Sequence, residues 1–448
     1  MNHKNRTHQR QLRAITYARA DDAFALSESH PIMTHFKLVL LLVSLLSAVA
    51  SAENWPGWRG PRGDGSSVEQ NVPLKWDATK DEGVAWKVAV PYGGHSSPVV
   101  WDDRVIVAGA DEANPRRMLM AFDRTSGKLL WEKEVAKTPL EKKHKLNSWA
   151  SGTPATDGKL IYAAFLDQQE MLVVAYDFDG NEKWSLRPGV FSSVHGYCSC
   201  PVLFEQTVIV NGDHDGEAYL VALDRETGKT IWKTPRENKT RSYCTPIIRD
   251  IDGRTQMILS GSKCVASYDP RTGQRHWILD GPTEQFVASP VMNKGLVFIT
   301  GGFPDKHILA IDPRGSGTIN EQSHVKWHHL NKGVSYVPSP VAANDFFFCV
   351  SDGGVASCYD AVTGDVKWQE RLGRHHSGSL VAAAGRVYFV DDDGITHVMN
   401  AGPEFKVLAA NPLGEEVYSS PAISRDQLLI RGEKHLFCIG AATKTAAR

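Results

Sequence analysis

Aromatic and histidine side chains recur at eight similar places in the sequence, each shortly before a group of small residues that usually ends in Pro. They are His95, Trp149, Tyr197, Tyr243, Phe286, Tyr336, His376 and Tyr418. His195, Arg241, Arg374 and His375 lie beside them. Flat ring faces, imidazoles and guanidinium groups brought together could bind a planar polyacid or a sugar. Equally, the rings could simply fill a narrow channel, because duplicated repeats keep one residue type at equivalent places.

Other kinds of site find little support in the sequence. Four Asp-Gly segments, at 177–180, 213–216, 250–253 and 391–394, could suggest calcium, but none continues to a Glu at calcium-loop spacing. Asp-Gly is a common turn pair, so we expect turns at these places. The neighbours His95 and Ser96 lack the Gly-x-Ser-x-Gly elbow of hydrolases. We therefore expect no metal ion and assign no catalytic residue.

The elements that must position the aromatic side chains are short strands that repeat. Four segments contain an apolar strand, an Asp-x-x-Thr/Ser-Gly turn and a second strand with a Trp; they are 121–131, 222–232, 267–277 and 358–368. Two degenerate copies end at Trp184 and Trp327. Gly takes the positive-φ position of such a turn, so each copy predicts a hairpin with a bulged loop. One hairpin cannot bury its Trp alone, so the copies must stack as repeats.

The groups of small residues divide the chain into eight units. They begin at Ser96, Gly152, Ser199, Cys244, Ala288, Pro338, Ser377 and Ser419. Intervals of roughly 40 to 55 residues suit four-stranded blades, and Pro is tolerated at the first position of a strand. The seventh unit, 377–409, lacks a Trp and is the weakest of the eight.

The two ends of the array complement each other. The eighth unit has three strands and no Trp strand, whereas residues 84–90 form a Trp strand without partners. Pairing them closes a ring without an exposed edge. The sequence thus predicts an all-β, eight-bladed β-propeller of four-stranded antiparallel blades over residues 84–440, closed by an N-terminal strand in the C-terminal blade.

Composition and the N-terminal region narrow the setting. Fifty Lys and Arg against 51 Asp and Glu give a formal net charge of −1, so nothing favours nucleic acid or an anionic membrane as a partner. Residues 33–52 predict a signal peptide cut before Glu53, and the apolar run 38–49 is too short to span a bilayer. Residues 1–32 are a polar extension, with Met33 as an alternative start. We expect an exported monomer, either periplasmic or extracellular, without a membrane span.

The remaining segments are an arm, a tail and scattered cysteines. The arm, residues 53–83, contains three Trp and should be ordered by docking on the propeller, whereas residues 441–448 should be a disordered tail. Of seven cysteines, Cys349 and Cys358 flank a Gly-Gly turn and predict either a cross-strand disulfide or two buried thiols. Cys198 and Cys200 lie one residue apart on a strand and should face opposite ways.

The repeated pattern Ala-x-Asp-x-x-Thr-Gly-x-x-x-Trp resembles the tryptophan-docking motif of the pyrroloquinoline quinone (PQQ) repeat propellers, and the WPGWRGP segment at 55–61 resembles the start of secreted members. The resemblance covers about 84–440 and implies eight blades that interlock through their Trp residues. It also implies two functional classes of protein with this fold: dehydrogenases with PQQ and Ca²⁺ in the central funnel, and cofactor-free scaffolds for other proteins. Fold alone does not choose between them.

The residues expected at the funnel of this chain favour the cofactor-free class. The dehydrogenases carry an adjacent Cys-Cys pair, whereas Ser199 separates Cys198 from Cys200 here, and no Asp or Glu stands at the expected funnel positions. We therefore expect a module that binds a protein partner or a small ligand at the central funnel. A PQQ- and Ca²⁺-dependent oxidoreductase acting on alcohols or sugars is the alternative, and a carbohydrate-binding propeller is a weaker one.

Overall fold

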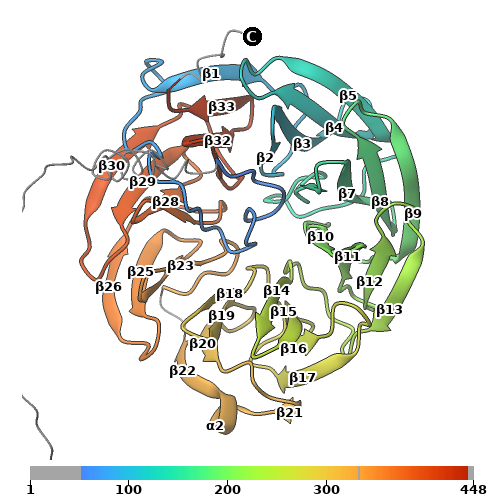
Figure 1. The fold of residues 1–448 in the computed structure, drawn as a ribbon, viewed down its shortest axis with the longest axis vertical. Helices are drawn as coiled ribbons and strands as arrows, with labels where there is room; N and C mark the ends of the chain where they lie inside the picture. Colours follow the sequence, from blue (N-terminus) through green and yellow to red (C-terminus); the bar gives the residue numbers. More distant parts are fainter. Residues whose placement is uncertain (1–51, 331–332, 442–448) are drawn as a thin grey trace, which may run out of the picture. The chain divides into compact units, whose positions relative to one another are not determined.

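The computed structural model describes residues 52–330 and 333–441, which form a closed ring of eight β-sheets (Figure 1). The predicted eight-bladed propeller is therefore confirmed, including the seventh blade that lacks a Trp. The predicted leader, residues 1–52, and tail, residues 441–448, lie outside the described residues except for Ala52 and Ala441. Within the described part of the chain the single helix is α2 (Glu321–His324).

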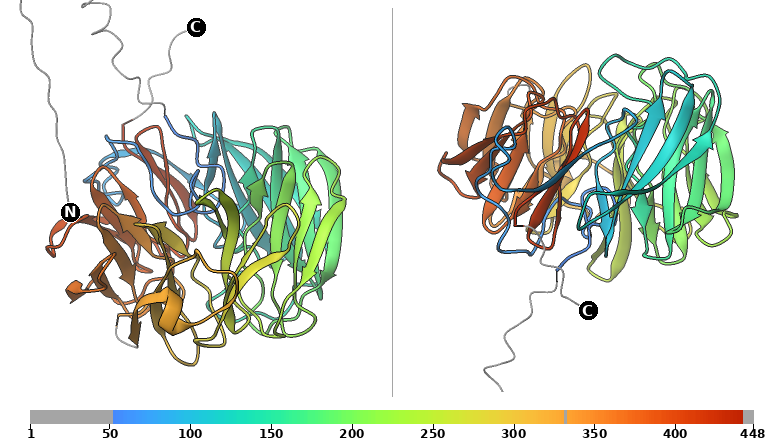
Figure 2. Two further views of the ribbon diagram at one scale, coloured as in Figure 1. Left: turned by 60° about the horizontal axis from the view of Figure 1, so that its bottom comes forward. Right: turned by 90° about the horizontal axis from the view of Figure 1, so that it is seen from above.

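Each blade contains four antiparallel strands arranged outward from the axis of the ring (Figure 1), and Figure 2 shows the ring from two further directions. Blades 1 to 4, numbered along the chain, contain β2 (Val99–Trp101), β3 (Arg104–Asp111), β4 (Arg116–Asp123), β5 (Leu129–Ala136); β6 (Ala155–Thr156), β7 (Leu160–Asp167), β8 (Glu170–Asp177), β9 (Glu182–Val190); β10 (Val202–Phe204), β11 (Thr207–Gly212), β12 (Tyr219–Asp224), β13 (Thr230–Pro235); and β14 (Ile247–Ile251), β15 (Arg254–Gly261), β16 (Cys264–Tyr268), β17 (Arg275–Asp280).

Blades 5 to 8 contain β18 (Val291–Asn293), β19 (Leu296–Gly301), β20 (His307–Ile311), β22 (Val325–Leu330); β23 (Val341–Ala343), β24 (Phe346–Val350), β25 (Val355–Asp360), β26 (Val366–Arg371); β27 (Val381–Ala383), β28 (Arg386–Val390), β29 (Ile395–Asn400), β30 (Val407–Pro412); and β31 (Ala422–Ser424), β32 (Gln427–Arg431), β33 (His435–Ile439), β1 (Val84–Ala89). The middle strands are buried on both faces because each blade packs against two neighbours.

The Asp-x-x-Thr-Gly turn has the chemistry that its sequence predicts. In blade 3, the Asp224 carboxylate accepts the backbone N–H and the hydroxyl of Thr227, at 2.8 and 2.7 Å. Gly228 has a φ of +72° and its N–H donates to the Asp224 carbonyl. The register shifts between Ala222 and Leu223, as expected for a bulged hairpin.

The tryptophan of one blade docks on this turn in the next blade. Its indole N–H donates to a turn carbonyl. Where the turn Gly is present, the indole ring lies where a Cβ on that Gly would be. Glycine is therefore required both for the positive φ of the turn and for the space that the ring occupies. The pairs are Trp86–Arg124 (2.9 Å), Trp131–Phe178 (2.8 Å), Trp184–Arg225 (3.0 Å), Trp232–Pro270 (3.0 Å), Trp327–Ala361 (3.2 Å) and Trp368–Gly402 (3.2 Å). The interlocking that the resemblance implied is present.

Blade 4 departs from this scheme because blade 5 carries an insertion. The inserted strand β21 (Gly317–Ile319) pairs in parallel with β17 and makes blade 4 five-stranded. The Trp277 indole here donates to the Gln256 side chain instead of a carbonyl of the next blade.

The ring is closed by β1, which pairs antiparallel with β33 in blade 8, with Val84 opposite Ile439 and Ala89 opposite His435. The chain therefore completes its last blade with its first strand, as the incomplete end units predicted.

The N-terminal arm replaces the missing Trp of blade 7. Ala409 occupies the register position that Trp131 holds in blade 1. Trp76 of the arm is 5% exposed and belongs to the same apolar cluster, and its backbone N–H donates to the Asn411 side chain at 3.0 Å. The arm thus seals the joint between blades 7 and 8.

The first part of the arm crosses the middle of the ring, as the blue segment in Figure 1 shows. Trp55 exchanges two backbone hydrogen bonds with Val100 of blade 1. Arg59 is buried and donates to the carbonyls of Ser339, Pro340 and Leu380 in blades 6 and 7. Specific hydrogen bonds therefore hold this part of the arm inside the ring.

Of the two alternatives predicted for Cys349 and Cys358, the two buried thiols are confirmed and the cross-strand disulfide is wrong. Cys349 lies opposite Ser357, and Cys358 lies opposite Phe348, so the two side chains point to opposite faces of the sheet. All seven cysteines fall within the described residues and all are free thiols.

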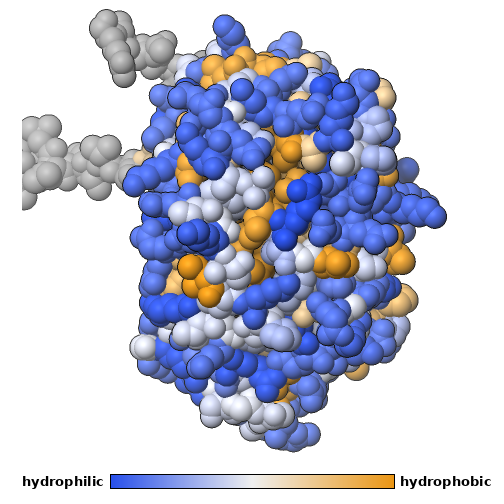
Figure 3. Space-filling model, turned by 90° about the vertical axis from the view of Figure 1, so that its right-hand side faces the viewer, coloured by the Kyte–Doolittle hydropathy of each residue, from blue (hydrophilic) through white to orange (hydrophobic). Residues whose placement is uncertain are grey.

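Figure 3 shows one side of the outer wall of the ring. The side of the ring seen in Figure 3 is largely hydrophilic, interrupted by apolar side chains. Within residues 52–330 and 333–441, no helix has the length and apolar character needed to cross a bilayer.

Candidate functional site

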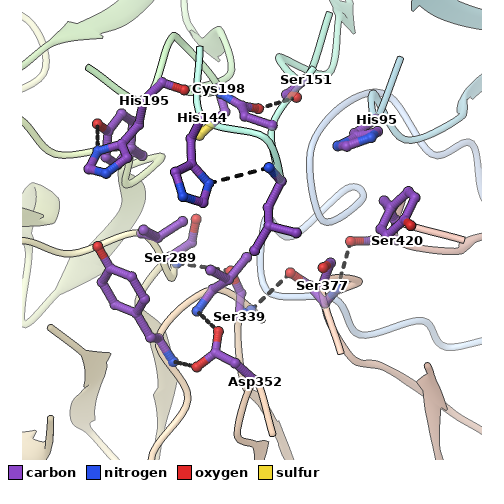
Figure 4. A pocket seen from close by; sticks show the side chains of 18 of the residues that line it. His95, His144, Ser151, His195, Cys198, Ser289, Ser339, Asp352, Ser377 and Ser420 are labelled. Atoms are coloured by element: carbon purple, nitrogen blue, oxygen red, sulfur yellow. Dashed lines mark hydrogen bonds between the residues drawn. The ribbon is translucent and has the colours of Figure 1, made fainter. Parts of the chain in front are cut away.

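A cavity of about 590 Å³ lies on the axis of the ring (Figure 4). Its lining comes from all eight blades and from Trp58 of the arm. Three tiers can be distinguished by their register on the innermost strands and the loops before them: a floor of hydroxyl groups, a middle tier two residues earlier in each blade, and a rim of loop residues.

The floor belongs to a circle of one residue from each blade, two positions before the first residue of the innermost strand, and six of the eight line the cavity. The eight are Ser97, Thr153, Cys200, Thr245, Ser289, Ser339, Ser379 and Ser420. The backbone N–H of each donates to the side chain of its counterpart in the next blade, at 2.9 to 3.2 Å, from Ser97 to Thr153 and onward to Ser420, which donates back to Ser97. The circle lacks the link from Thr245 to Ser289, where Ser289 accepts the Trp58 indole N–H at 3.0 Å instead.

The middle tier is set by the two-residue period of extended chain. The residue two positions before each floor residue lines the cavity in every blade: His95, Ser151, Cys198, Tyr243, Val287, Val337, Ser377 and Tyr418. The residues immediately before the floor positions are buried in the blades. Alternation of side chains along extended backbone explains both sets.

The rim carries most of the ionisable groups, and each has a partner in the wall. Arg241 pairs with Asp215 at 2.7 Å, and Lys306 pairs with Asp352 at 3.3 Å. Asp352 also accepts the backbone N–H groups of Tyr336 and Val337 at 3.2 and 3.0 Å. Asp352 is the one carboxylate among the lining residues.

Histidines reach the cavity from four loops. The Nδ1 of His195 lies 2.9 Å from the Tyr243 hydroxyl, which also lies 2.6 Å from Ser193. His144 packs edge-on against His195, the tilted rings of His95 and Tyr418 lie 4.8 Å apart between centroids, and His375 pairs with Asp392.

Burial sets the direction of the resolved pKa shifts here. Desolvation, followed by the nearby Arg241 charge, lowers the pKa of His195 below its ordinary 6.5. Desolvation raises the pKa of Tyr336 and of Tyr418 to about 12 and that of Tyr243 further. These tyrosines are therefore neutral donors at physiological pH and His195 is a neutral imidazole.

The structure brings seven of the twelve predicted residues together in the cavity: His95, His195, Arg241, Tyr243, Tyr336, His375 and Tyr418. Trp149 lines a neighbouring cavity of about 270 Å³, which also reaches His95 and Tyr418. Arg374 is exposed on the loop before blade 7, outside both cavities.

Three predicted residues lie behind the wall. Tyr197, Phe286 and His376 are buried, at 5%, 0% and 0% exposure. Each stands three positions before a floor residue and packs into the blade, whereas Tyr336, at the same offset from Ser339, still reaches the cavity. Sequence reasoning selected them by residue type and not by a fixed register.

The same reasoning missed the small members of the wall. Ser151, Cys198, Val287, Val337 and Ser377 line the cavity, as does Trp58 of the arm. Counting two residues back from the floor position in each unit finds the first five. The position of Trp58 could not be predicted, because nothing in the sequence of the arm indicates where it docks.

The Asp-Gly segments serve other purposes. Asp177 accepts the N–H groups of Asp179 and Asn181, as a turn residue does. Asp213 is fully buried and pairs with Arg236 at 2.8 Å. Across the described residues, no group of three His, Cys, Asp or Glu side chains is placed to hold a metal ion.

Comparison with known proteins identifies relatives of this arrangement. A family model described as "Outer membrane protein assembly factor BamB" matches residues 74–141, 115–303 and 304–402. No curated protein matches the sequence. The structure is similar to BamB from Moraxella catarrhalis, with a TM-score of 0.57 and 12% identity over 80% of this chain and 99% of that one.

It is also similar to the quinohemoprotein alcohol dehydrogenase from Comamonas testosteroni, with a TM-score of 0.63 and 14% identity over 88% and 81% of the two chains. A europium-containing methanol dehydrogenase gives a TM-score of 0.51 and 13% identity over 85% and 90%. At these identities the solved structures show the fold alone.

Proposed function

The chain belongs to the family of PQQ-repeat propellers described as outer membrane protein assembly factor BamB, and from this premise we propose that it is a binding module that takes a ligand or a segment of a protein partner into the funnel. The observation that carries the proposal is the axial cavity of about 590 Å³, a volume typical of ligand sites.

The residues that line the cavity are better suited to binding a ligand than to catalysing a reaction. Aromatic and apolar faces alternate with fixed polar groups, which is typical of recognition sites. The cationic side chains of the rim are held by wall carboxylates, so their positions are set before any ligand arrives. Leu146, Phe303 and Val337 line the mouth while being 54%, 55% and 36% exposed, and they offer an apolar contact to whatever enters.

The alternative, an oxidoreductase like the dehydrogenases of similar fold, requires that PQQ and Ca²⁺ fit the funnel. Ca²⁺ prefers several oxygen ligands, including carboxylates. The lining offers one carboxylate, Asp352, which already serves Lys306 and two amides. Cys198 faces the cavity, whereas the Cys200 thiol accepts the Thr153 N–H in the floor circle, so the two do not form a paired disulfide surface. The residues do not fit this pair of groups.

A carbohydrate ligand fits less well than an acidic one. The lining has one carboxylate, Asp352, which Lys306 already engages, and two side chains that can only donate, Arg241 and Lys306. Its hydroxyls and neutral imidazoles can donate or accept, so the charge of the lining favours an acid over a neutral sugar. The His95 and Tyr418 rings would still provide faces for a sugar ring.

We also place the protein outside the cytoplasm as an exported monomer with residues 84–440 as one propeller and 53–83 as its arm. The supports are the signal-like segment 33–52 and the family description as an outer-membrane assembly factor. N-terminal sequencing of the mature protein tests this placement: a start at Glu53 supports export, and a start at Met1 contradicts it.

The funnel proposal is tested by protecting Cys198 from alkylation. Cys198 lines the cavity, whereas the other six cysteines are buried, so its labelling by N-ethylmaleimide reports on occupancy. A panel of small acids, sugars and peptides should contain compounds that slow this labelling. If none does, the funnel is not a binding site. PQQ with Ca²⁺ belongs in the panel: a shifted quinone spectrum with dye-linked oxidation of an alcohol or sugar would establish the oxidoreductase instead.

A further inference from the structure

The floor of the funnel offers hydrogen-bond donors that have nothing to bind. Six floor hydroxyls line the cavity and are at most 5% exposed: Ser97, Thr245, Ser289, Ser339, Ser379 and Ser420. Each oxygen accepts one N–H, from a backbone amide or from Trp58. Among the described residues none of the six donates its own proton to an acceptor. A buried donor without an acceptor is unfavourable, so this floor is suited to an occupant rich in acceptor oxygens.

Two buried guanidinium groups stand next to the floor without a counter-ion. Arg59 donates to the carbonyls of Ser339 and Leu380, which belong to or adjoin floor residues. Arg431 donates to the Ser96 hydroxyl at 3.1 Å, directly beside Ser97. Within the described part of the chain neither forms an ion pair with a carboxylate. Burial lowers the pKa of each to about 10, which leaves both charged at neutral pH.

The positive charges of Arg59 and Arg431 and the hydroxyl protons of the floor both favour an anionic ligand. A buried positive charge attracts an anion more strongly than an exposed one, because the surroundings screen it less. Trp58 of the arm and Tyr243 and Tyr418 of the middle tier also line the cavity, whose volume admits a ring system. Figure 4 shows Ser289, Ser339 and Ser420 around the cavity, together with the His95 and His195 side chains.

We propose that the floor is an oxyanion site that takes the carboxylate of a small aromatic acid, with the aromatic body held between Trp58 and the middle tier. The proposal rests on the funnel being a binding site and adds the chemical class of the ligand. The floor hydroxyls donate to the carboxylate, and Arg59 and Arg431 favour its charge from behind the wall.

Two floor threonines provide a matched test. Thr245 and Thr153 each accept one backbone N–H of the circle, at 3.1 and 2.9 Å, but Thr245 lines the cavity and Thr153 does not. Binding of 2-naphthoate and of its neutral analogue 2-naphthamide is measured by calorimetry on the full mature chain of wild type, Thr245→Val and Thr153→Val. We expect Thr245→Val to weaken naphthoate binding about tenfold, the usual loss for a hydrogen bond to a charged group, and Thr153→Val to leave it unchanged.

The outcomes separate the two levels of the proposal. Equal naphthoate affinity in wild type and Thr245→Val, with Cys198 still protected, overturns the oxyanion floor but keeps the funnel as a binding site. Preference for naphthamide over naphthoate does the same. If neither probe binds and no compound protects Cys198, both proposals fail. Should Thr245→Val fold poorly by circular dichroism, Ser379→Ala provides the second variant, with the same expected loss.

Discussion

The side-chain oxygen of Gln256 lies 2.8 Å from the indole nitrogen of Trp277, and its amide nitrogen lies 3.1 Å from the carbonyl oxygen of Pro313 in blade 5. Gln256 therefore bridges the two blades at the joint where direct Trp docking is absent. It also accepts the Ser267 hydroxyl at 2.7 Å and is itself fully buried.

Replacing Gln256 by Leu should destabilise the propeller by about 3 kcal/mol, because the buried Trp277 indole N–H and Ser267 hydroxyl lose their partner and the Pro313 carbonyl keeps only its bond from Arg254. The urea midpoint measures the loss. In a Trp277→Phe background the same change should cost less, since the indole N–H is already gone. An additive double mutant would contradict the bridging role.

Ala at Gly273 should cost about 2 kcal/mol more than Ala at Gly253. Both glycines have a positive φ, at +71° and +77°, so both variants carry the left-handed backbone penalty. A Cβ at Gly273 would meet the Thr234 hydroxyl first and would lie 2.7 Å from the Trp232 ring, whereas one at Gly253 meets nothing within 4 Å. Equal unfolding midpoints for the two variants would show that neither the Thr234 side chain nor the indole is wedged against the turn.

Arg59→Met should release the arm from the ring, because carbonyls of blades 6 and 7 lose their donor. Limited trypsin digestion followed by mass spectrometry should show rapid cleavage after Arg62 and Lys75. The control is Glu53→Ala, which breaks a partly exposed ion pair of the same arm with Arg62 and should change stability by no more than about 1 kcal/mol. Similar digestion of the two variants would count against Arg59 as the anchor.

The protein should lose thermal stability as the pH falls below 6.5. Burial lowers the pKa of His195, His214 and His307 in the folded state, so the unfolded chain binds protons that the folded chain refuses. This stability is complete above pH 6.5 and is lost as the pH falls through the lowered values. Glu433, whose pKa is lowered first by its hydrogen bond to His95, adds a separate loss below pH 4.5.

Melting temperatures between pH 7.5 and 5.0 test this expectation. His214 is the most telling of the three, because its Nδ1 is buried without a partner and would carry an unsatisfied N–H if protonated. His214→Phe should make the melting temperature fall less steeply over this range. An unchanged slope would place the effect elsewhere.

Thiol labelling should distinguish Cys198 from the other six cysteines. Cys198 lines the cavity and is partly exposed, whereas the other six thiols are buried, so access distinguishes them. Thiol acidity does not, because burial raises the pKa of Cys198 as well as those of Cys200, Cys244, Cys264 and Cys438. Native protein should therefore take up one label before any other, and unfolded protein without reductant should take up seven. Five labels after unfolding would reveal a disulfide.

The ring could be predicted because its determinants are local. The Trp, the turn Gly and the small residues before each innermost strand are chemical requirements of one hairpin, and counting them gives eight blades and the closure. The fifth strand of blade 4 could not be found in this way, since β21 pairs with β17 across an insertion in another unit. The bridging role of Gln256 depends on that insertion, so it could not be predicted from the sequence either.

The site was predicted in part for a related reason. Alternation along extended backbone decides whether a side chain faces the axis, and one residue of offset turns Phe286 or His376 into the blade. Ser151 and Val287 were passed over because they are small or aliphatic, although their register places them on the wall. The floor circle depends on contacts between blades, which no single unit contains.

The pairing of β1 with β33 has a mechanical consequence. Val84 and Ile439 are partners at the same end of the ladder, so tension applied between these two positions peels the strands apart one hydrogen bond at a time and does not shear the whole ladder at once. A ring that withstands heat through its many wedged joints should thus open at modest force when pulled at this seam, and attaching the handles on either side of a different joint should require more.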